Sequence, residues 1–368
     1  MAHINSLTIK NFKSHQKYQI DFKNFHNNVV VYGPNGIGKT NLIETISFFS
    51  NSKGIRGGGL EKIKPHIDQH SNTEVKINVN INNREYHLSY DIFEEDNNFK
   101  KNFYLEDKKI PLSKIKEVLS LIWLSPHTDK VMYEGQSIKK NFLDKMISQN
   151  NQDFQNNLTQ YKKNTSERLA ILKTTKDEKW LNVIEQKLSE NIFFILKYRR
   201  DYAKNLNFIS NSKLEDFRPV EILYKEELSK LIDNNDEAKS YFLSELKKSR
   251  FLDEKNGRTN FGINIDEVFF LDKKSNSNTD MCSTGEQKSC LLSIILSNCW
   301  NLFQEKKEFI LLFDEISSHV DEKNLKKFFD EVEKFNTQIW YTGTSKNLFQ
   351  VIENKAFFID LTTSKSPF

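Results

Sequence analysis

Residues 27–49 read NNVVVYGPNGIGKTNLIETISFF, and this stretch decides the fold. It starts as an apolar strand, continues through a glycine-rich loop over 33–40 and ends in a helical pattern. This is the strand–loop–helix setting of the phosphate-binding motif G-x-x-x-x-G-K-[S/T]. Glycines let backbone N–H groups turn inward around phosphates, and the helix N-terminus adds positive potential. We therefore expect a mononucleotide-binding loop within an α/β fold.

The loop residues have separate expected roles. Lys39 would neutralise β- and γ-phosphate oxygens of ATP, and the Thr40 hydroxyl would ligate Mg²⁺. An ordinary glycine turn before a helix is the alternative, but both the pattern and its context favour the phosphate loop. The expected nucleotide-binding residues are Gly33, Pro34, Asn35, Gly36, Ile37, Gly38, Lys39 and Thr40.

A second motif, FILLFDEIS at 309–317, is an apolar strand that ends in two carboxylates. A carboxylate at the end of a strand beside the phosphate loop is where a partner of Mg²⁺ must lie. We expect Asp314 to be that partner and Glu315 to act as the general base that polarises the attacking water. Without the phosphate loop, Asp-Glu after an apolar strand would be unremarkable.

A third motif, STGEQK at 283–288, opens a helical pattern. Its hydroxyl, its glycine and the helix N-terminus suit the binding of a terminal phosphate. The alternative is a capping box, in which Ser283 pairs with Glu286. The local residues fit both interpretations.

Composition bounds the class of protein. The chain has 368 residues, a length that allows a substantial core. It has 54 Lys and Arg against 50 Asp and Glu, and this near-balance of charge does not indicate any class of binding partner. The three cysteines lack the spacing of a metal site, which favours buried thiols. The N-terminus lacks a signal-peptide pattern and the apolar runs are too short to span a bilayer. We expect a cytoplasmic protein without a membrane partner.

The chain divides by its patterns. The first 125 residues favour strands, residues 137–206 read as amphipathic helices, and residues 283–360 alternate helix and strand. We expect one α/β domain formed by 1–125 and 265–368, split by a helical lobe over 126–264.

The helical segment over 137–206 carries the basic excess, with 14 Lys and Arg against 8 Asp and Glu. Such a surface would track DNA phosphates without reading sequence. The alternative is a solvated helix face. The candidate DNA contacts are Lys139, Lys140, Lys162, Lys163, Arg199 and Arg200.

The order GPNGIGKT, STGEQK, LLFDE, SHVD resembles that of ABC-type ATPases of the SMC/Rad50/RecF group, and NFKSH at 11–15 resembles the first-strand motif of that group. Within the group the chain is most similar to the RecF family, because GKTNLIE, IWLSPHTD, KKNFLDK, GRTNFG and YTGT follow in the order of that family. The resemblance implies a P-loop ABC-type ATPase head, α/β in class, split by an inserted helical lobe.

The resemblance also implies a head-to-head dimer that sandwiches two ATP molecules. Ser283, Gly285 and Gln287 would reach the γ-phosphate held by the other subunit. The D-loop residue Asp321 would cross the dimer interface. Thr342 and Thr344 would occupy the switch position. Lys13 and Arg56 match basic positions that approach the nucleotide, and the alternative is that they are solvated surface charges.

In function, the resemblance implies a weak, DNA-linked ATPase that closes on gapped or duplex DNA near single-strand junctions and supports recombinase loading in repair and replication restart. RecR and RecO would be its partners. The chain departs from the family at Ile263 and Asn264, where Pro-His is usual, and at Lys139-Lys140, where Arg-Arg is usual. These departures concern the lobe and its DNA contacts. No glutamine lies in 122–129, so no Q-loop residue is assigned.

Two alternatives remain. An OLD-like or other SMC-type defence ATPase would usually add a nuclease domain, for which the sequence after the switch strand leaves no room. A nucleotide-gated scaffold would bind ATP with little hydrolysis, and Glu315 argues against it.

Overall fold

The computed structural model describes residues 2–24, 26–50, 54–63 and 72–363. The chain forms two compact units, of which one comprises 1–129 with 298–368 and the other comprises 130–297.

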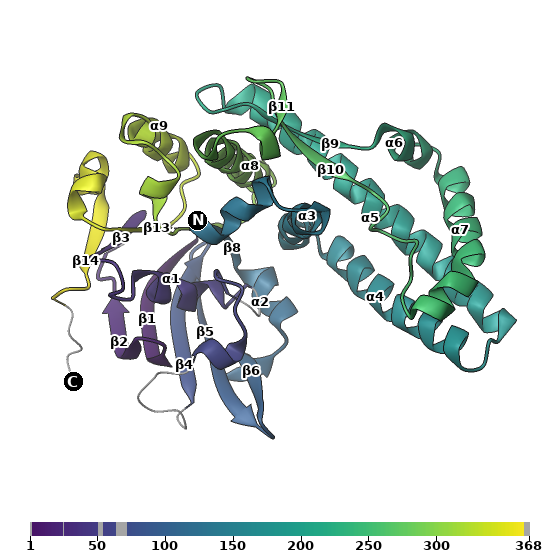
Figure 1. Cartoon of the computed structure of the whole chain (residues 1–368). Helices are drawn as coiled ribbons and strands as arrows, with labels where there is room; N and C mark the ends of the chain where they lie inside the picture. The colour runs from purple at the N-terminus through teal and green to yellow at the C-terminus, as the bar shows by residue number, and fades with distance from the viewer. Residues whose placement is uncertain (1, 25, 51–53, 64–71, 364–368) are drawn as a thin grey trace. The chain divides into compact units, whose positions relative to one another are not determined.

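A parallel sheet of five strands organises the first unit (Figure 1). The strand order is β14 (Ala356–Asp360), β3 (Asn28–Tyr32), β13 (Ile339–Gly343), β12 (Phe309–Phe313) and β8 (Ser120–Leu124). All neighbouring pairs are parallel, so the carboxyl ends of the strands meet at one edge. Every residue of β12 is buried, as expected for an apolar strand covered on both faces. Strand β13 lies between β3, which leads into the phosphate loop, and β12, which leads into the Asp-Glu pair.

An antiparallel sheet of six strands forms the other layer of this unit. Its order is β2 (His15–Asp21), β1 (Ala2–Phe12), β4 (Thr73–Ile81), β5 (Arg84–Glu95), β6 (Asn98–Leu105) and β7 (Lys108–Ile110). The alternation in TEVKINVNI is reproduced in β4, where every second residue is buried. The helices of the unit include α1 (Lys39–Ser47), α2 (Leu112–Val118) and α9 (Glu322–Glu333).

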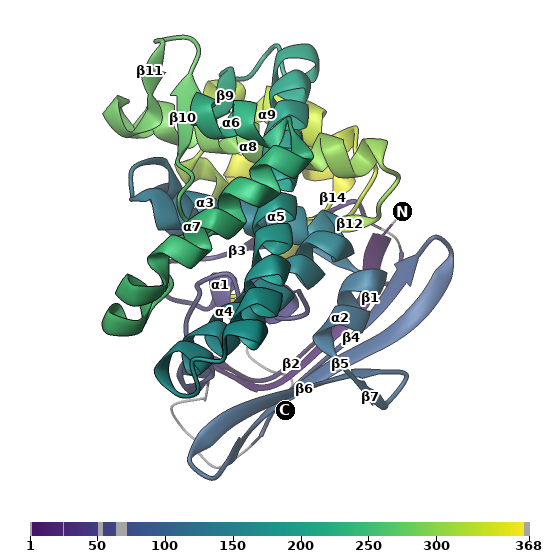
Figure 2. The ribbon, with the colours of Figure 1, turned by 90° about the vertical axis from the view of Figure 1, so that its right-hand side faces the viewer.

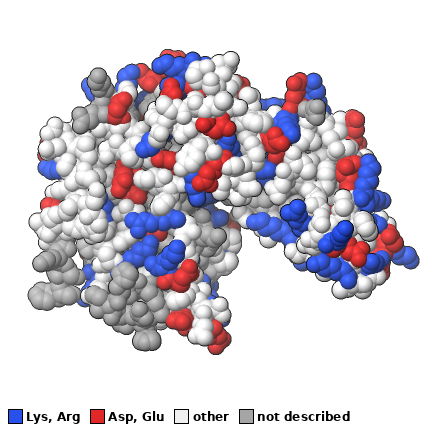
Figure 3. All heavy atoms as spheres, in the orientation of Figure 1, with Lys and Arg blue, Asp and Glu red and all other residues white. Residues whose placement is uncertain are grey.

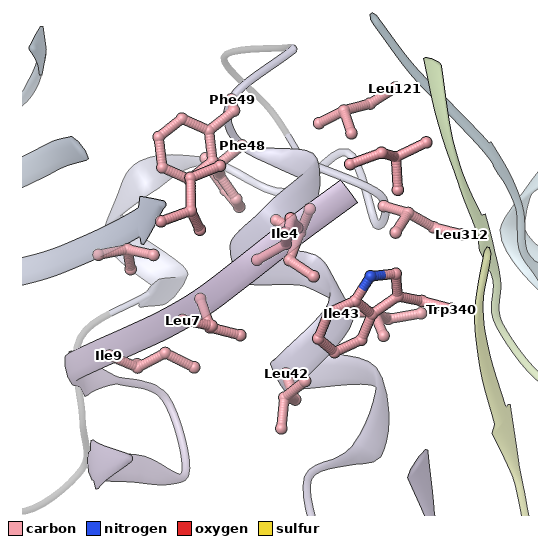
Figure 4. Packing of buried hydrophobic residues seen from close by; sticks show 14 of the residues in the cluster. Ile4, Leu7, Ile9, Leu42, Ile43, Phe48, Phe49, Leu121, Leu312 and Trp340 are labelled. Carbon is pink, nitrogen blue, oxygen red and sulfur yellow. The ribbon is translucent and has the colours of Figure 1, made fainter. Parts of the chain in front are cut away.

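One hydrophobic core joins the two sheets and α1. Figure 4 shows Ile4 and Leu7 of β1 beside Leu42 and Ile43 of α1, and Trp340 of β13 belongs to the same cluster. All five side chains are fully buried. Helix α1, which follows the phosphate loop, is therefore held in place by packing against both sheets.

Helices dominate the second unit, which confirms the prediction for 137–206 (Figure 2). They are α3 (Gln136–Asn150), α4 (Gln152–Lys173), α5 (Glu178–Lys213), α6 (Glu226–Ile232) and α7 (Asn235–Asn256). A small sheet adds β9 (Val220–Tyr224), β10 (Val268–Asp272) and β11 (Ser277–Asn278). The core of this unit includes Phe154, Leu188, Ile192 and Phe242 from α4, α5 and α7.

Residues 265–297 group with the helical unit, although our sequence-based division placed them with the ATPase head. The reason is local pairing, since β10 forms an antiparallel ladder with β9. Helix α8 (Thr284–Gln304) starts in the second unit and ends in the first. It is thus a continuous element common to both.

Candidate nucleotide site

The phosphate loop has the backbone that its glycines predict. Gly33, Gly36 and Gly38 have φ values of 148°, 83° and 109°, in the region that favours glycine. At Gly38 space is also limiting, because a Cβ there would lie 2.6 Å from Ser14 Oγ. Helix α1 begins immediately afterwards, at Lys39. The loop and the helix N-terminus therefore form the expected anion-binding arrangement.

Lys39 lies inside this loop. Its Nζ donates hydrogen bonds to the carbonyl oxygens of Gly33 at 2.7 Å and Pro34 at 2.9 Å. Burial lowers the pKa of Lys39, while the charges of Glu315 and Asp314 oppose that shift. The ammonium is thus placed among loop groups that would surround phosphates.

Asp314, directly after β12, is hydrogen-bonded to helix α1 and to strand β13. Its Oδ1 accepts hydrogen bonds from Thr40 Oγ1 at 2.9 Å and from Thr342 Oγ1 at 2.8 Å. Burial raises the pKa of Asp314, the two threonine hydroxyls lower it, and the charge of Glu315 raises it further. A hydroxyl and a carboxylate are oxygen ligands of the kind that Mg²⁺ prefers, so Thr40 and Asp314 fit the metal role expected of them.

Glu315 is held in an uncommon backbone conformation. Its φ is 52°, in the left-handed region that non-glycine residues rarely adopt. Its N–H donates a hydrogen bond of 2.8 Å to Thr342 Oγ1. Thr342 thus fixes both carboxylate residues, whereas Thr344, the other expected switch residue, is exposed just after β13. The structure distinguishes these two threonines, which the sequence did not.

The turn between β1 and β2 buttresses the loop. His15 Nε2 lies 3.1 Å from the Gly38 carbonyl oxygen, and Ser14 Oγ accepts a hydrogen bond of 2.8 Å from Asn41 Nδ2. Lys13 forms an ion pair with Glu44 of α1. Burial lowers the pKa of Lys13, which the Glu44 carboxylate partly offsets.

Sequence reasoning noted NFKSH at this turn but assigned no site role to His15 or Asn41. The exposed Arg56 also joins this group, since its Nη1 donates to Asn41 Oδ1 at 3.0 Å. Lys13 and Arg56 therefore contact the first turns of α1, the helix that follows the phosphate loop, and their approach to the nucleotide stays a prediction.

The D-loop residue Asp321 caps a helix. Its Oδ1 accepts a hydrogen bond of 2.9 Å from the Asn324 N–H at the start of α9. Nearby, the buried His319 has its Nδ1 3.3 Å from Asp129 Oδ1. This contact joins the D-loop to Asp129, the last residue of the first unit before the helical insertion.

The STGEQK motif belongs to the second unit. Ser283 and Glu286 form the capping box, with the Ser283 N–H 2.9 Å from Glu286 Oε2. Arg218 Nη2 also donates to Glu286 Oε1, at 2.8 Å. Gln287 Nε2 donates to the Thr279 carbonyl oxygen at 2.9 Å. Ser283 and Gly285 are exposed at the helix N-terminus, so the capping box leaves their surface open to a ligand.

These two units carry the motifs of one protein family. The model of the RecF/RecN/SMC N-terminal domain family matches residues 3–364. The chain belongs to this family. Among its relatives is the DNA replication and repair protein RecF of Rickettsia rickettsii (strain Sheila Smith), 27% identical over 364 residues, which span 97% of this chain and 99% of the relative.

Solved structures of family members agree. The chain is similar to the recombination mediator protein RecF-ATP in the RecFOR pathway, with a TM-score of 0.82 and 22% identity, covering 98% of each chain. It is also similar to RecF-ATPrS of that pathway, with a TM-score of 0.80 and 24% identity, covering 97% of this chain and 96% of the other. The predicted resemblance to RecF and the predicted fold class are confirmed.

Four of the six expected DNA contacts are corrected by the structure. Arg199 is buried and binds Asp144 through two hydrogen bonds of 2.7 and 2.8 Å, and Arg200 is paired with Asp266 at 2.9 Å. The four buried residues among the six candidates are Lys139, Lys140, Arg199 and Arg200. Their charges are used inside the unit, so the expectation that they form a phosphate-tracking surface is wrong.

Lys162 and Lys163 remain exposed on α4. Figure 3 shows Lys and Arg side chains gathered at the lower right end of the helical unit, with Asp and Glu side chains among them.

The departures from the family pattern lie in the same buried network. The backbone carbonyl of Ile263 accepts a hydrogen bond of 2.7 Å from Arg199 Nη1, and that of Asn264 accepts one of 3.0 Å from Lys140 Nζ. Because backbone groups make these contacts, the segment is held without the side chains that are usual in the family.

Among the helices of the described residues, none combines the length and the hydropathy that a membrane-spanning helix needs.

Proposed function

We propose that this protein is an ATP-dependent DNA-binding protein of the RecF type, in which ATP closes a dimer and slow hydrolysis reopens it. The observation that carries the proposal is the hydrogen-bonded group of Thr40, Asp314 and Thr342 beside the phosphate loop, with Glu315 next in the chain. Relatives named DNA replication and repair protein RecF, similar over nearly the whole chain, support it.

ATP would bind in the phosphate loop. Lys39 would exchange its hydrogen bonds to the Gly33 and Pro34 carbonyls for the β- and γ-phosphate oxygens, which are stronger acceptors. Thr40 and Asp314 would hold Mg²⁺, and the metal would supply neutralisation of the developing phosphate charge.

Hydrolysis needs a base opposite the γ-phosphate. Glu315 follows Asp314 directly, and its backbone N–H is held by Thr342, so its side chain leaves the main chain next to the metal-associated carboxylate. We propose that it accepts the proton of the attacking water. Thr342 would act as a positioning residue for both carboxylates.

The dimer would complete each site. Ser283, Gly285 and Gln287 would contact the γ-phosphate bound by the other subunit, with Asp321 at the interface. Exposure of Ser283 and Gly285 supports this role. Gln287 would first release the Thr279 carbonyl that it binds within its own unit.

The ATP-bound dimer would hold duplex or gapped DNA near single-strand junctions and support recombinase loading, with RecR and RecO as partners. Because four expected contacts are buried, the cations available on α4 include Lys162 and Lys163. Binding through such residues would be sensitive to salt and insensitive to sequence.

Light scattering tests the switch. The wild type should dimerise with Mg-ATP, Glu315→Gln should prolong the dimer because hydrolysis is blocked, and Lys39→Ala should stay monomeric under the same conditions. Glu95→Gln is a matched control, because this exposed glutamate of β5 pairs with Lys100 of β6, in the antiparallel sheet. A dimer that Glu315→Gln does not prolong would instead indicate the nucleotide-gated scaffold, and a monomer indifferent to ATP and to gapped duplex would contradict the proposal.

A further inference from the structure

The end of strand β8 brings a hydroxyl to the sheet edge at which Asp314 lies. Strand β8 ends at Leu124, and Ser125 follows it directly. In the register of the sheet, Phe313 of β12 lies opposite Leu124, so the next residues, Asp314 and Ser125, are neighbours across the two strands. The Asp314 N–H donates a hydrogen bond of 2.8 Å to the Leu124 carbonyl oxygen, which continues the ladder to this point. Because Pro126 comes next, Ser125 favours an extended backbone.

The side chains of Ser125 and Asp314 point to the same face of the sheet. Residues two apart along a strand share a face. Leu121 of β8 and Leu312 of β12 belong to the hydrophobic core that also contains residues of α1 (Figure 4). Ser125 lies four residues after Leu121, and Asp314 lies two residues after Leu312, so both lie on the side of α1. The hydrogen bond from Thr40 of α1 to Asp314 agrees with this placement.

The Ser125 hydroxyl is buried and has spare capacity for a ligand. The residue is fully buried, and within the described residues its hydroxyl is bonded to Thr128 Oγ1 at 3.3 Å, which is long for two hydroxyls. A hydroxyl has one proton to donate and two lone pairs to accept, so one partner leaves a lone pair over. The Thr128 N–H donates to the Ser125 carbonyl oxygen, so the hydroxyl does not cap the 3₁₀ helix η2 (Pro126–Met132).

The spacing of the strands suits a metal shared by Asp314 and Ser125. Thr40 and Thr342 both donate to Asp314 Oδ1, which leaves Oδ2 for the metal. Neighbouring strands lie about 4.8 Å apart. Two oxygens that each bind one Mg²⁺ at about 2.1 Å lie within about 4.2 Å of each other. A short oxygen-bearing side chain opposite Asp314 therefore reaches the same ion.

The other oxygen-bearing side chains after β8 have different surroundings. In residues 122–129 they are Thr128 and Asp129. Asp129 Oδ1 lies 3.3 Å from Nδ1 of His319, in the D-loop. Thr128 belongs to η2, beyond the end of the strand, and contacts Ser125. Ser125 is thus the oxygen donor that β8 places in register with Asp314.

We propose that Ser125 is a third oxygen ligand of the Mg²⁺ that Thr40 and Asp314 would hold. The assignment rests on the proposed function, because it needs ATP and Mg²⁺ at the phosphate loop. Ser125 would turn its hydroxyl from Thr128 to the ion, so that α1, β12 and β8 would each contribute one ligand.

Titration with Mn²⁺ tests the ligand set without turnover. Mn²⁺ takes the place of Mg²⁺, and its electron paramagnetic resonance signal measures the free ion. With a non-hydrolysable ATP analogue bound to the full chain, Ser125→Ala should raise the dissociation constant of Mn²⁺ by about tenfold. Thr128→Val is the matched control, because it removes the hydrogen-bond partner of Ser125 and keeps the Ser125 hydroxyl. It should leave the constant unchanged.

The outcomes separate this proposal from the proposed function. Tight Mn²⁺ binding that Ser125→Ala does not weaken, or that Thr128→Val weakens equally, would overturn the ligand role and leave the ATPase function standing. A wild type that binds neither the analogue nor Mn²⁺ would contradict the proposed function, and the ligand role with it.

A cysteine in place of the serine gives a positive signal. Ser125→Cys replaces a hard oxygen by a thiolate, which prefers a softer metal such as Cd²⁺. This variant should show an ultraviolet thiolate-to-Cd²⁺ charge-transfer band that appears only with the ATP analogue. The wild type, which has three cysteines of its own, and Thr128→Cys should not show it. Absence of the band in Ser125→Cys, or an equal band in Thr128→Cys, would overturn the proposal.

Discussion

Thr342 donates a hydrogen bond to the same oxygen of Asp314 that accepts one from Thr40, and the Thr342 oxygen in turn accepts the N–H of Glu315. One hydroxyl on β13 therefore connects the metal-associated carboxylate to the expected general base. This follows from the strand order, which places β13 between β3 and β12.

Replacing Thr342 with valine keeps the shape of the side chain and removes the hydroxyl. Asp314 then loses one donor and the Glu315 N–H loses its acceptor, each buried loss costing about 1–3 kcal/mol. We expect ATP hydrolysis to fall by at least tenfold, with Thr342→Ser retaining most activity. Steady-state phosphate release measures both, and Thr344→Val, at an exposed position, should change little. Equal rates in Thr342→Val and wild type would contradict the positioning role.

Replacing Gly38 with alanine affects both conformation and space. The φ of 109° strains any other residue, and the new Cβ would lie 2.6 Å from Ser14 Oγ. We expect binding of a fluorescent ATP analogue to be lost. Ser14→Ala added to Gly38→Ala should recover only part of it, because His15 Nε2 is also within 3.1 Å of the Cβ position. Gly57→Ala is the control, with a positive φ of 66° but no neighbouring atom within 4 Å, and it should leave binding unchanged.

Sequence reasoning succeeded where the backbone pattern fixes the geometry. The glycine spacing and the apolar strand of 309–313 predict which residues reach the same edge of a parallel sheet. It failed for charges in the helical unit, because a count of lysines and arginines does not say which face of a helix they occupy. A signal was present: Ile192, Leu196, Arg199 and Ala203 follow a four-three-four spacing, which places Arg199 on the apolar face. The buttress at Gly38 lies beyond such reasoning, since it joins a turn to a loop more than twenty residues away in sequence.

Lys101 gives the stability of the first unit a dependence on pH. Its Nζ lies 4.4 Å from the ring centre of Phe48 and 4.7 Å from that of Phe103, and burial lowers its pKa to about 7. Between about pH 7 and its unfolded pKa near 10.5, the unfolded chain binds this proton and the folded chain does not, so stability rises with pH.

Urea unfolding across this range should therefore show a slope that Lys101→Met removes. The difference in slope is at most about 1.4 kcal/mol per pH unit. The control is Lys100→Met, because Lys100 is exposed and paired with Glu95. Parallel pH profiles for the wild type and Lys101→Met would show that Lys101 keeps its proton in the folded state.

A variant of Arg199 distinguishes a structural role of this residue from a role in DNA binding. Its guanidinium is buried against Asp144 and the Ile263 carbonyl, so Arg199→Met leaves a buried carboxylate without its partner. We expect a loss of about 3–5 kcal/mol in the free energy of unfolding, measured with urea. Lys162→Gln combined with Lys163→Gln, on the exposed face of α4, should leave stability within about 0.5 kcal/mol and reduce the salt dependence of duplex binding instead. A stable Arg199→Met variant with a reduced salt slope would reverse this assignment and place Arg199 at the DNA surface.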